Sequence, residues 1–496
     1  MGIENKELTI SLDDILAYSY LYVPILVFLL GWIRPYLAYP ACTLLLLCTF
    51  SGLHKKQIII GNVFTQKSQI ALLLFSLLLL LWCILSGQGG LVLQPGDWNK
   101  HNTILSDLIN YDWPVRYSFQ GMHGTMSYYI GAYLLPALTG KIAGKFEAAE
   151  WCLLVWCWLG LFLTGIKCWN YIDGKRRWKL LAVGMCMILF STFISPLTTL
   201  YGYLIPGDCG DGVHWMSASI RIQYSSNIIL LRWVFPQTIP AWLTSIMLLE
   251  RRKDIRSWGL TCVPLILYST FAFIGIVIIA LFWGLVDYKK SGKSINRVGY
   301  IKDLFSSHNL AALFVLAVLS AYLSGNILQP KPSEAAMGLT QIDYTHYKTL
   351  FVLFHLSWGI WIALLFWKEG KQELLYTIVI SLFLFPFVSL GTYNDLCMRA
   401  SIPALFLLCI LVMRQLLSEK SRKAYRLLLL CALLISSTKS CKELYRAVTQ
   451  GGIHAGNHCT PYHNLTELME EFTPATYQYV DWNVENGINQ WIVRKE

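Results

Sequence analysis

The run Ile70-Ala-Leu-Leu-Leu-Phe-Ser-Leu-Leu-Leu-Leu-Leu-Trp-Cys-Ile-Leu85 carries no charged residue. It approaches the ~20 apolar residues that a helix needs to cross the hydrocarbon core of a bilayer. The run 310–323 has the same character. Strands of a membrane barrel alternate apolar and polar residues, and no such alternation is visible, so the spans are expected to be helices. The sequence therefore predicts an all-α, polytopic membrane protein.

The composition of the whole chain agrees with this class. Of the 496 residues, 55% are hydrophobic and 14% are charged, whereas a soluble protein of this length carries about a quarter charged residues. The net charge of +11 comes from basic residues that cluster in short loops between apolar runs. This distribution is the positive-inside pattern of membrane proteins and not the basic stripe of a nucleic-acid-binding domain. We therefore expect membrane lipids, and no nucleic acid, as partners.

The apolar runs and the charges between them predict about thirteen spans. Counting 258–286 as two spans keeps the basic block 289–302 on the same side as the other basic loops, as the positive-inside rule requires. More than half of the 40 Lys and Arg residues then face the cytoplasm, with the N-terminus inside and the C-terminus outside. The predicted spans are 16–32, 38–53, 69–86, 150–166, 180–197, 231–249, 258–270, 271–286, 309–327, 349–367, 373–390, 400–413 and 427–438.

The polar segments of the chain are predicted to lie on the extracytoplasmic side. The stretch 126–145 is apolar but short, and Gly131 and Pro136 interrupt it. We therefore expect an interfacial or re-entrant helix there and not a span. The predicted units are a transmembrane domain at 1–438, with outer loops at 87–149, 198–230 and 328–348, and an extracytoplasmic tail at 439–496 that forms a small helical cap.

The polar stretch Gly96-Asp97-Trp98-Asn99-Lys100-His101-Asn102 follows the third apolar run and falls at the outer membrane boundary. Asp97 comes after Pro-Gly and before a helical pattern, which is typical of an N-cap. The alternative is a general base or charge stabiliser, since partial desolvation beside an interfacial helix makes a carboxylate a better base. His101 lies one turn further on the same helix face. Capping and catalysis are compatible, so Asp97 and His101 are the candidate catalytic residues.

Aromatic and basic side chains of the first outer loop are candidate substrate ligands. Trp98 or Trp113 is placed to stack on a sugar ring, and Arg116 is placed to pair with a phosphate. The alternative is an interfacial aromatic belt with a salt bridge, which is the commoner use of such residues at a membrane edge. The sequence leaves both interpretations open.

Two further basic residues lie at the outer ends of apolar runs. Arg232, beside Trp233, either extends its side chain to the interface or binds a lipid diphosphate. Asp395 and Arg399 lie in a short turn between two predicted spans, where charges need partners. They form either a structural ion pair or a phosphate site in which Arg399 reaches the ligand.

Metal and disulfide chemistry stay open at this stage. The second outer loop contains Pro206-Gly-Asp-Cys-Gly-Asp-Gly212 and then His214, which hints at a cation site. Because the remaining oxygen ligands of a calcium loop are missing, a glycine-rich turn is the favoured interpretation. No cofactor is predicted with certainty, and a divalent metal remains possible. Cys441 and Cys459 of the tail either pair, in an oxidising compartment, or remain free thiols.

Many spans, a long outer loop with an interfacial helix and an aspartate at its membrane edge together resemble the GT-C class of membrane glycosyltransferases, over residues 65–415. The resemblance implies that a sugar is transferred from a polyprenyl-phosphate-linked donor to a glycan, lipid or protein acceptor. It implies Asp97 as base or charge stabiliser, and Arg116, Arg232 and Arg399 as ligands of the carrier phosphate. A bacterial plasma (inner) membrane fits the size and the loops. Here the loop follows the third span and not the first.

Two other functions are left open. A transporter or flippase of a lipid-linked or small polar solute places ionisable residues and broken helices near the bilayer midplane, where this sequence has few charges. A non-catalytic subunit of an envelope-assembly complex would use the tail, with Trp482 and Trp491, as a docking surface. No P-loop, serine-nucleophile elbow, HExxH motif or dinucleotide fingerprint occurs, so ATP hydrolysis and soluble-cofactor chemistry are not supported.

Overall fold

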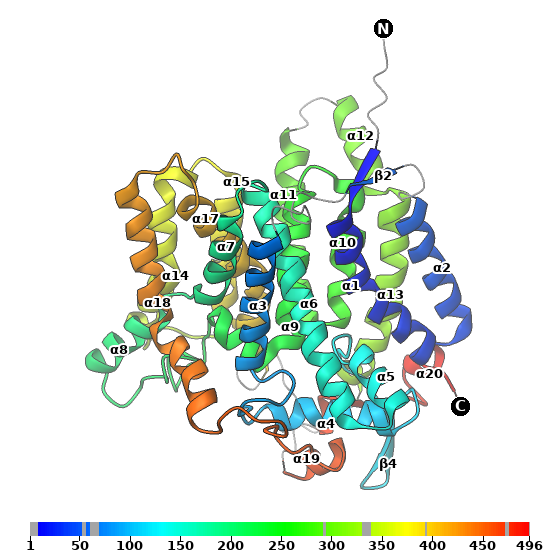
Figure 1. Ribbon diagram of the computed structural model, residues 1–496. Helices are drawn as coiled ribbons and strands as arrows, with labels where there is room; N and C mark the ends of the chain where they lie inside the picture. The colour runs from blue at the N-terminus through cyan, green and yellow to red at the C-terminus, as the bar shows by residue number, and fades with distance from the viewer. Residues whose placement is uncertain are drawn as a thin grey trace.

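Seven helices of the described residues are long and apolar enough to cross a membrane. The computed structural model describes residues 8–51, 56–59, 69–290, 294–329, 339–391, 394–471 and 476–495. Five of them are the single helices α1 (Leu12–Trp32), α6 (Phe146–Ile172), α11 (Thr270–Lys290), α13 (Ser307–Leu328) and α14 (Lys348–Glu369). The other two each combine two consecutive helices: Trp178–Leu204 contains α7 (Trp178–Leu189) and α8 (Ile194–Leu204), and Asp395–Leu416 contains α16 (Asp395–Ala400) and α17 (Ile402–Leu416). Figure 1 shows most of them upright and side by side, as in a multi-pass membrane protein.

The prediction of about thirteen spans is wrong, because only seven helices of the described residues have the length and apolar character of a span, and several of the predicted runs form shorter helices. A helix of 17 residues such as α3 is about 26 Å long, against ~30 Å of hydrocarbon. The shorter apolar helices are α2 (Pro35–Ser51), α3 (Gln69–Leu85), α10 (Trp258–Cys262), which continues as a 3-10 turn (Val263–Leu267), and α15 (Glu373–Leu384). Two long helices, α9 (Asn227–Glu250) and α18 (Lys423–Thr449), are not among the seven.

Local sequence explains where several helices begin and end. Serine side chains accept a backbone N–H at the start of three helices, from Asp14 to Ser11 at α1, from Ile229 to Ser226 at α9 and from Asn309 to Ser306 at α13. Such caps satisfy one of the unpaired donors of the first turn. The short helix α5 (Leu134–Ala143) ends at Gly144, whose φ of 63° is the left-handed conformation that glycine adopts most readily.

Small elements lie at the two ends of the bundle. One end carries α12 (Ser294–Leu304) with the parallel strands β1 (Leu8–Ser11) and β2 (Lys56–Ile59). The other end carries α4 (Trp98–Asn110), α5, α19 (Leu465–Glu471) and α20 (Asn489–Ile492). The two helices of the loop 87–149, α4 and α5, lie at this end beneath the upright helices (Figure 1).

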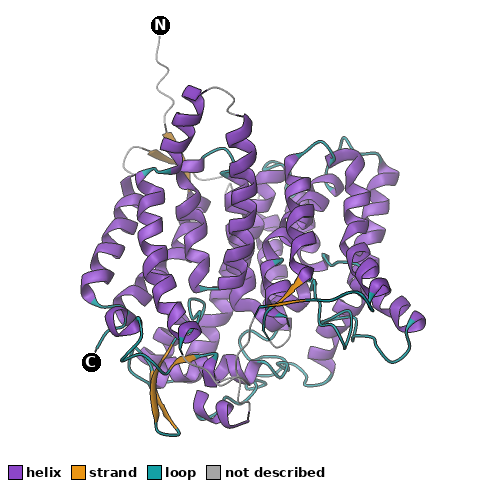
Figure 2. Cartoon of the chain, turned by 180° about the vertical axis from the view of Figure 1, so that it is seen from behind, coloured by secondary structure: helices purple, strands orange, loops and turns teal. Residues whose placement is uncertain are grey.

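A hairpin with a third strand is a feature that the sequence analysis missed. Strands β3 (Arg116–Phe119) and β4 (Met122–Met126) pair antiparallel, and β7 (Val480–Asp481) of the tail pairs with β4. Figure 2 shows this hairpin projecting from the end of the helical bundle. The strands are too short to give a clear alternation of apolar and polar residues. The sheet ties the tail to the first outer loop.

The tail differs in detail from the expected helical cap. Helix α18 continues without interruption past residue 439, where the tail was predicted to begin, and ends at Thr449. The following segment folds back on the first outer loop, where the Asn102 side chain donates to the carbonyl oxygen of Cys459 at 2.7 Å. Cys441 and Cys459 are both free thiols.

The other outer segments are partly described. Residues 330–338 of the loop predicted at 328–348, and residues 392–393 of the short turn before α16, lie outside the described residues. After the gap, β5 (Thr340–Gln341) pairs antiparallel with β6 (Val388–Ser389). The loop at 198–230 begins with the last turns of α8 and leads into α9.

The centre of the bundle is packed with buried aromatic rings. The ring of Trp242 on α9 stacks on Trp82 of α3 at 5.8 Å and on Phe406 of α17 at 5.2 Å between centroids. Trp82, Trp242 and Phe406 are nearly inaccessible to solvent. Stacked aromatic pairs contribute roughly 0.5–1.5 kcal/mol beyond their buried area. This packing holds α9 at the middle of the bundle, where its first turns form one wall of the site.

Candidate functional site

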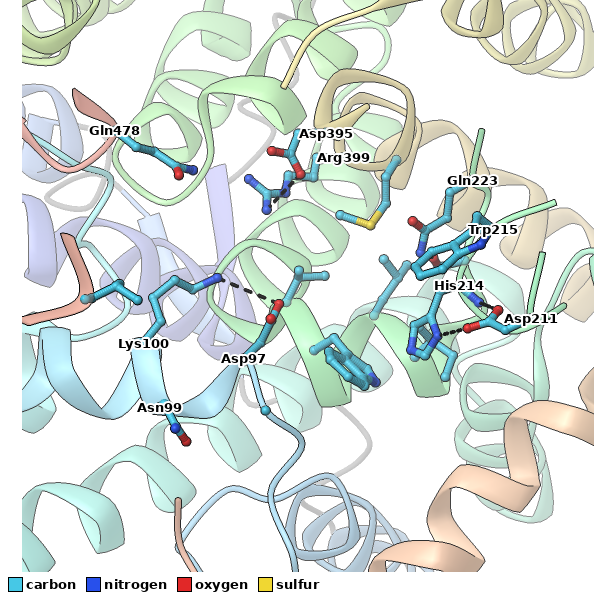
Figure 3. A pocket seen from close by; sticks show the side chains of 18 of the residues that line it. Asp97, Asn99, Lys100, Asp211, His214, Trp215, Gln223, Asp395, Arg399 and Gln478 are labelled. Atoms are coloured by element: carbon cyan, nitrogen blue, oxygen red, sulfur yellow. Dashed lines mark hydrogen bonds and ion pairs between the residues drawn. The ribbon is translucent and has the colours of Figure 1, made fainter. Parts of the chain in front are cut away.

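A cavity of about 620 Å³ opens at the end of the bundle that carries α4 and α19. Its walls come from segments far apart in the chain: the start of α4, the loop 205–226, the start of α9, α16 and the tail at 462–479. The ionisable groups that line it, other than tyrosines, are Asp97, Lys100, Asp211, His214, Asp395 and Arg399. Figure 3 shows these side chains around one space, with Asp97 and Lys100 on one side and Asp211 and His214 on the other.

A bend in α9 shapes the wall behind Asp97. The helix is non-helical at Val234, with φ −136° and ψ 35°, two residues before Pro236. Because proline has no N–H, it cannot bond the carbonyl oxygen four residues earlier, which belongs to Arg232. The indole Nε1 of Trp98 donates to that oxygen at 2.8 Å. The bend therefore lies in the cavity wall, which Val234 helps to form, and it docks the start of α4 on α9.

Asp97 precedes the first residue of α4 but does not cap the helix. Its backbone is already helical, with φ −60° and ψ −16°, and within the described part of the chain its side chain makes no capping hydrogen bond. The capping interpretation of Asp97 is therefore wrong, since the carboxylate turns into the cavity. Its side chain keeps 52% of its accessible surface, and its Oδ2 lies 3.8 Å from Nζ of Lys100.

The charge state of Asp97 follows from its neighbours. Partial burial acts to raise the pKa of Asp97, but the positive charges of Lys100 and Arg399 act in the other direction and lower it overall. The carboxylate is therefore ionised at neutral pH. The expectation that desolvation makes Asp97 a stronger base is reversed, because a lowered pKa weakens a base while it strengthens the role of a fixed negative charge.

Arg399 forms the opposite pole of the cavity. Its Nη2 lies 3.0 Å from Oδ1 of Asp395, and its Nη1 donates to the Tyr129 hydroxyl at 2.8 Å. The Nε atom is buried and has no hydrogen-bond partner among the described residues. Asn394 starts α16 from the left-handed region, with φ 56°, and its Oδ1 accepts the N–H of Cys397. The structural Asp395–Arg399 pair is thus present, with one guanidinium donor left over.

His101 lies behind the cavity wall and not on it. Its Nδ1 is 2.6 Å from the Tyr133 hydroxyl, and its Nε2 is 3.1 Å from the carbonyl oxygen of Trp233. Since a carbonyl only accepts, Nε2 carries the proton and Nδ1 accepts from Tyr133. Burial, together with the charge of Lys100, lowers the pKa of His101 to about 3, so the ring is neutral. With both nitrogens engaged, His101 positions α4 against α9 and has no free atom for proton transfer.

Trp98 and Arg232 hold the same junction and do not line the cavity. Trp98 is buried against Phe235, with ring centroids 4.8 Å apart. Arg232 is also buried, and its Nη1 and Nη2 donate to the carbonyl oxygens of Leu85 and Leu93 at 3.1 and 2.8 Å. The structure thus gives both residues intramolecular partners in place of the predicted sugar and phosphate.

Trp113 and Arg116 also lie away from the cavity. Trp113 packs against Trp32 of α1, with ring centroids 5.1 Å apart, and donates to the carbonyl oxygen of Leu108. Arg116 is exposed on the hairpin and lies 3.4 Å from the carbonyl oxygen of Arg494. The predicted platform of Trp113 and Arg116 therefore does not face the space that Asp97 and Arg399 share.

The second outer loop supplies residues that the sequence analysis had assigned to a turn. Asp211 Oδ1 accepts the N–H of Val213 at 2.8 Å and of His214 at 2.7 Å, and Asp211 Oδ2 bonds His214 Nδ1. Burial acts to raise the pKa of Asp211, but these hydrogen bonds lower it to about 2. The sequence feature that could have pointed to this pair is the glycine-rich stretch 206–212 and the histidine that follows it. Among the described residues, no group of three or more His, Cys, Asp or Glu is arranged to hold a metal ion.

Asp107, at the far end of α4, anchors the tail to the first outer loop. Its Oδ2 accepts the Tyr117 hydroxyl at 2.6 Å and the N–H of Leu465 at 3.1 Å, while Oδ1 is buried without a partner among the described residues. Burial raises the pKa of Asp107 to about 7. Ionisation of this carboxyl therefore opposes docking of the segment that brings Tyr462 and Tyr479 to the cavity.

Replacing Asp107 by Asn is expected to flatten the pH dependence of stability. The folded-state pKa of about 7 lies above the ordinary 3.8, so this contribution is fully present below pH 3.8 and is lost as the pH rises through about 7. Asn keeps the neutral shape at every pH. Thermal unfolding, followed by intrinsic fluorescence between pH 5 and pH 8, should show the gap between variant and wild type shifting in favour of the variant as the pH rises. Parallel curves would contradict this account.

Comparison of the chain with protein-family models, with curated proteins and with solved structures finds no match.

Proposed function

We propose that this protein is an integral-membrane glycosyltransferase, which transfers a sugar from a polyprenyl-phosphate-linked donor to an acceptor at the extracytoplasmic face. The observation that carries the proposal is the cavity itself. It places an ionised carboxylate, Asp97, across from a buried guanidinium, Arg399, at the end of a bundle of membrane-spanning helices. Negative and positive poles around one space suit a reaction in which charge separates between a sugar and its leaving phosphate.

The orientation of the bundle supports an extracytoplasmic site. The basic residues Arg251, Arg252 and Lys253 follow the end of α9, while the cavity lies at the other end of that helix. By the positive-inside rule the end with the basic loops faces the cytoplasm. β1, near the N-terminus, lies at the cytoplasmic end, and α20, near the C-terminus, lies at the cavity end (Figure 1). A plasma membrane of a bacterial cell is the setting proposed for this topology.

The lining of the cavity suits a lipid-linked sugar. Ile229, Leu230 and Val234 of α9 and Met398 of α16 give it an apolar wall, as a prenyl chain requires. Four aromatic side chains offer flat apolar faces on which a sugar ring can stack: Trp215, Trp233, Tyr462 and Tyr479. Two of the four come from the tail. The tail is thus part of the proposed binding site.

The proposed reaction needs no nucleotide. An acceptor hydroxyl attacks the anomeric carbon, and the bond from that carbon to the phosphate oxygen breaks with its electron pair on the phosphate. Arg399, whose Nε is unpaired within the described residues, and Lys100 are the cations placed to neutralise that charge. Asp97 stabilises the positive charge that develops on the sugar, or takes the proton of the acceptor.

A turnover assay in proteoliposomes tests the proposal against the alternatives. Purified protein would be given a polyprenyl-phosphate-linked sugar with a radiolabel in the sugar, together with candidate acceptors. Covalent transfer of label to an acceptor, with release of polyprenyl phosphate, is the expected result. Accumulation of label inside the vesicles without a new covalent product would identify a transporter. Inactivity alone but stable co-purification with a transferase would identify a non-catalytic subunit.

A further inference from the structure

We propose that His214, oriented by Asp211, accepts the proton of the attacking hydroxyl, while Asp97 serves as a fixed negative charge; this inference rests on the proposed glycosyl transfer. His214 and Asp97 lie on different sides of the cavity (Figure 3). The two residues come from different loops, and the helices α4, α5, α6, α7 and α8 all lie between them in the sequence. His214 thus acts as the base and Asp97 as the fixed negative charge, the two roles that the proposed reaction requires.

The Asp211 carboxylate is held in place by the backbone of its own turn. Its Oδ1 accepts two backbone N–H groups, those of Val213 and His214, at 2.8 and 2.7 Å. This fixes Oδ2 against Nδ1 of the His214 ring. An ionised carboxylate only accepts, so Nδ1 carries the hydrogen and Nε2 keeps its lone pair. The ring is thereby set in the tautomer that can take a proton at Nε2.

The Nε2 atom is without a protein partner. It is buried, and no described residue bonds it, although His214 lines the cavity. The ring packs edge-on against Trp233, with centroids 4.6 Å apart, so its orientation is fixed from that side also. Trp233 and Arg399 also line this cavity, and their Nε1 and Nε atoms are buried without partners among the described residues. The Nε2 atom of His214 is therefore not engaged by the described part of the chain.

The charges explain why the proton goes to His214. The positive charges of Lys100 and Arg399 lower the pKa of Asp97, which makes that carboxylate a weak base. A neutral imidazole with a free ring nitrogen is the commonest general base in enzymes. The positive charge that His214 gains is balanced by Asp211, which stays ionised.

The proposed sugar transfer is balanced in atoms and electrons. The hydroxyl oxygen of the acceptor forms a bond to the anomeric carbon as its proton moves to Nε2 of His214. The bond between that carbon and the phosphate oxygen breaks, and the polyprenyl phosphate leaves with the electron pair. The imidazolium, paired with Asp211, then returns its proton to solvent. No oxidant, reductant or further reactant is needed.

Four proteins would be compared in the transfer assay: the wild type, His214→Gln, Asp211→Asn and, as a matched control, Asp208→Asn. Asp208 lies in the same loop but bonds Ser217, Ser219 and Tyr201 and does not line the cavity. We expect kcat to fall about 10²- to 10⁴-fold in His214→Gln, with donor affinity unchanged. Asp211→Asn should lose a similar factor, because an amide N–H facing Nδ1 forces the proton onto Nε2. Asp208→Asn should keep the wild-type kcat.

Chemical rescue separates catalysis from folding. Added imidazole should restore part of the turnover of His214→Ala, since a base then occupies the space of the lost ring, and it should restore none in Asp97→Asn. Turnover by His214→Gln and Asp211→Asn at the wild-type rate would overturn the inference and leave the glycosyl transfer standing. A wild-type protein that forms no covalent product with any donor would overturn both.

Discussion

Replacing Asp97 by Asn is expected to lower the kcat of sugar transfer by about 10²- to 10³-fold, because it removes a carboxylate placed to stabilise the charge that develops on the sugar. The variant should fold normally. Asp97 makes no capping hydrogen bond to the described backbone, and its ion pair with Lys100, at 3.8 Å and half-exposed, contributes little to stability. Transfer rates and thermal unfolding of the purified variant measure the two effects.

Asp112→Asn is the matched control for that experiment. Asp112 lies in the same outer loop and also faces a lysine, with its Oδ1 3.9 Å from Nζ of Lys141, but its side chain is fully exposed and does not line the cavity. We expect its transfer rate to stay within about twofold of the wild type, as for most surface substitutions. Unchanged turnover in Asp97→Asn, or equal losses in both variants, would remove Asp97 from the mechanism.

Replacing Arg399 by Gln is expected to weaken binding of polyprenyl phosphate roughly 10- to 100-fold, which corresponds to the ~1.5–3 kcal/mol of a hydrogen bond to a charged group. It should also lower stability by about 3–5 kcal/mol, because Asp395 is left without its partner in a largely buried site. Binding is measured by titration of nanodisc-embedded protein, and stability by thermal unfolding. Arg399→Lys should recover part of the affinity, since it keeps the charge.

Arg414→Gln separates the two effects of the Arg399 change. Arg414 lies in the last turn of α17, the helix that follows α16, and it bonds the buried Glu369, with Nε to Oε1 at 3.1 Å; neither residue lines the cavity. Its loss should cost a similar amount of stability and leave the affinity for polyprenyl phosphate unchanged. A drop in affinity in Arg414→Gln as large as in Arg399→Gln would show that both variants act through folding alone.

The sequence located helices well and judged spans poorly. Apolar runs such as 70–85 do form helices, here α3, because leucine favours the helix, which pairs the backbone N–H and C=O groups internally. Whether such a helix is long enough to cross the membrane depends on a few residues at each end. The count of thirteen spans relied on the charges of the loops, which do not report the length of each helix. The hairpin of β3 and β4 was missed because four or five residues give no measurable alternation.

Part of the candidate site could be predicted from the sequence. Asp97, Asp395 and Arg399 are polar residues beside apolar runs, and the structure brings all three to one cavity. The direction in which each side chain points could not be predicted from the sequence. Trp98 and His101 donate to the carbonyl oxygens of Arg232 and Trp233, at the bend of α9. The position of that bend cannot be predicted from the spacing of apolar residues.

Contacts across hundreds of residues lie further out of reach of sequence patterns. Tyr462 and Tyr479 come to the cavity only because the tail docks on the first outer loop, where Asn102 bonds Cys459 and β4 pairs with β7. The pairing of Asp211 with His214 is local, but its position facing Asp97 depends on how the second outer loop packs over α9. Such contacts follow from the fold as a whole.

The central claim is that this cavity binds a lipid phosphate for group transfer. Its most direct test is a cryo-EM structure of the protein in nanodiscs with added polyprenyl phosphate. The account predicts density for the phosphate within hydrogen-bonding distance of Arg399 or Lys100, with the prenyl chain against the apolar wall of α9 and with Asp97 facing the phosphate. An empty cavity at saturating ligand, or a phosphate bound near the middle of the bilayer, would contradict it.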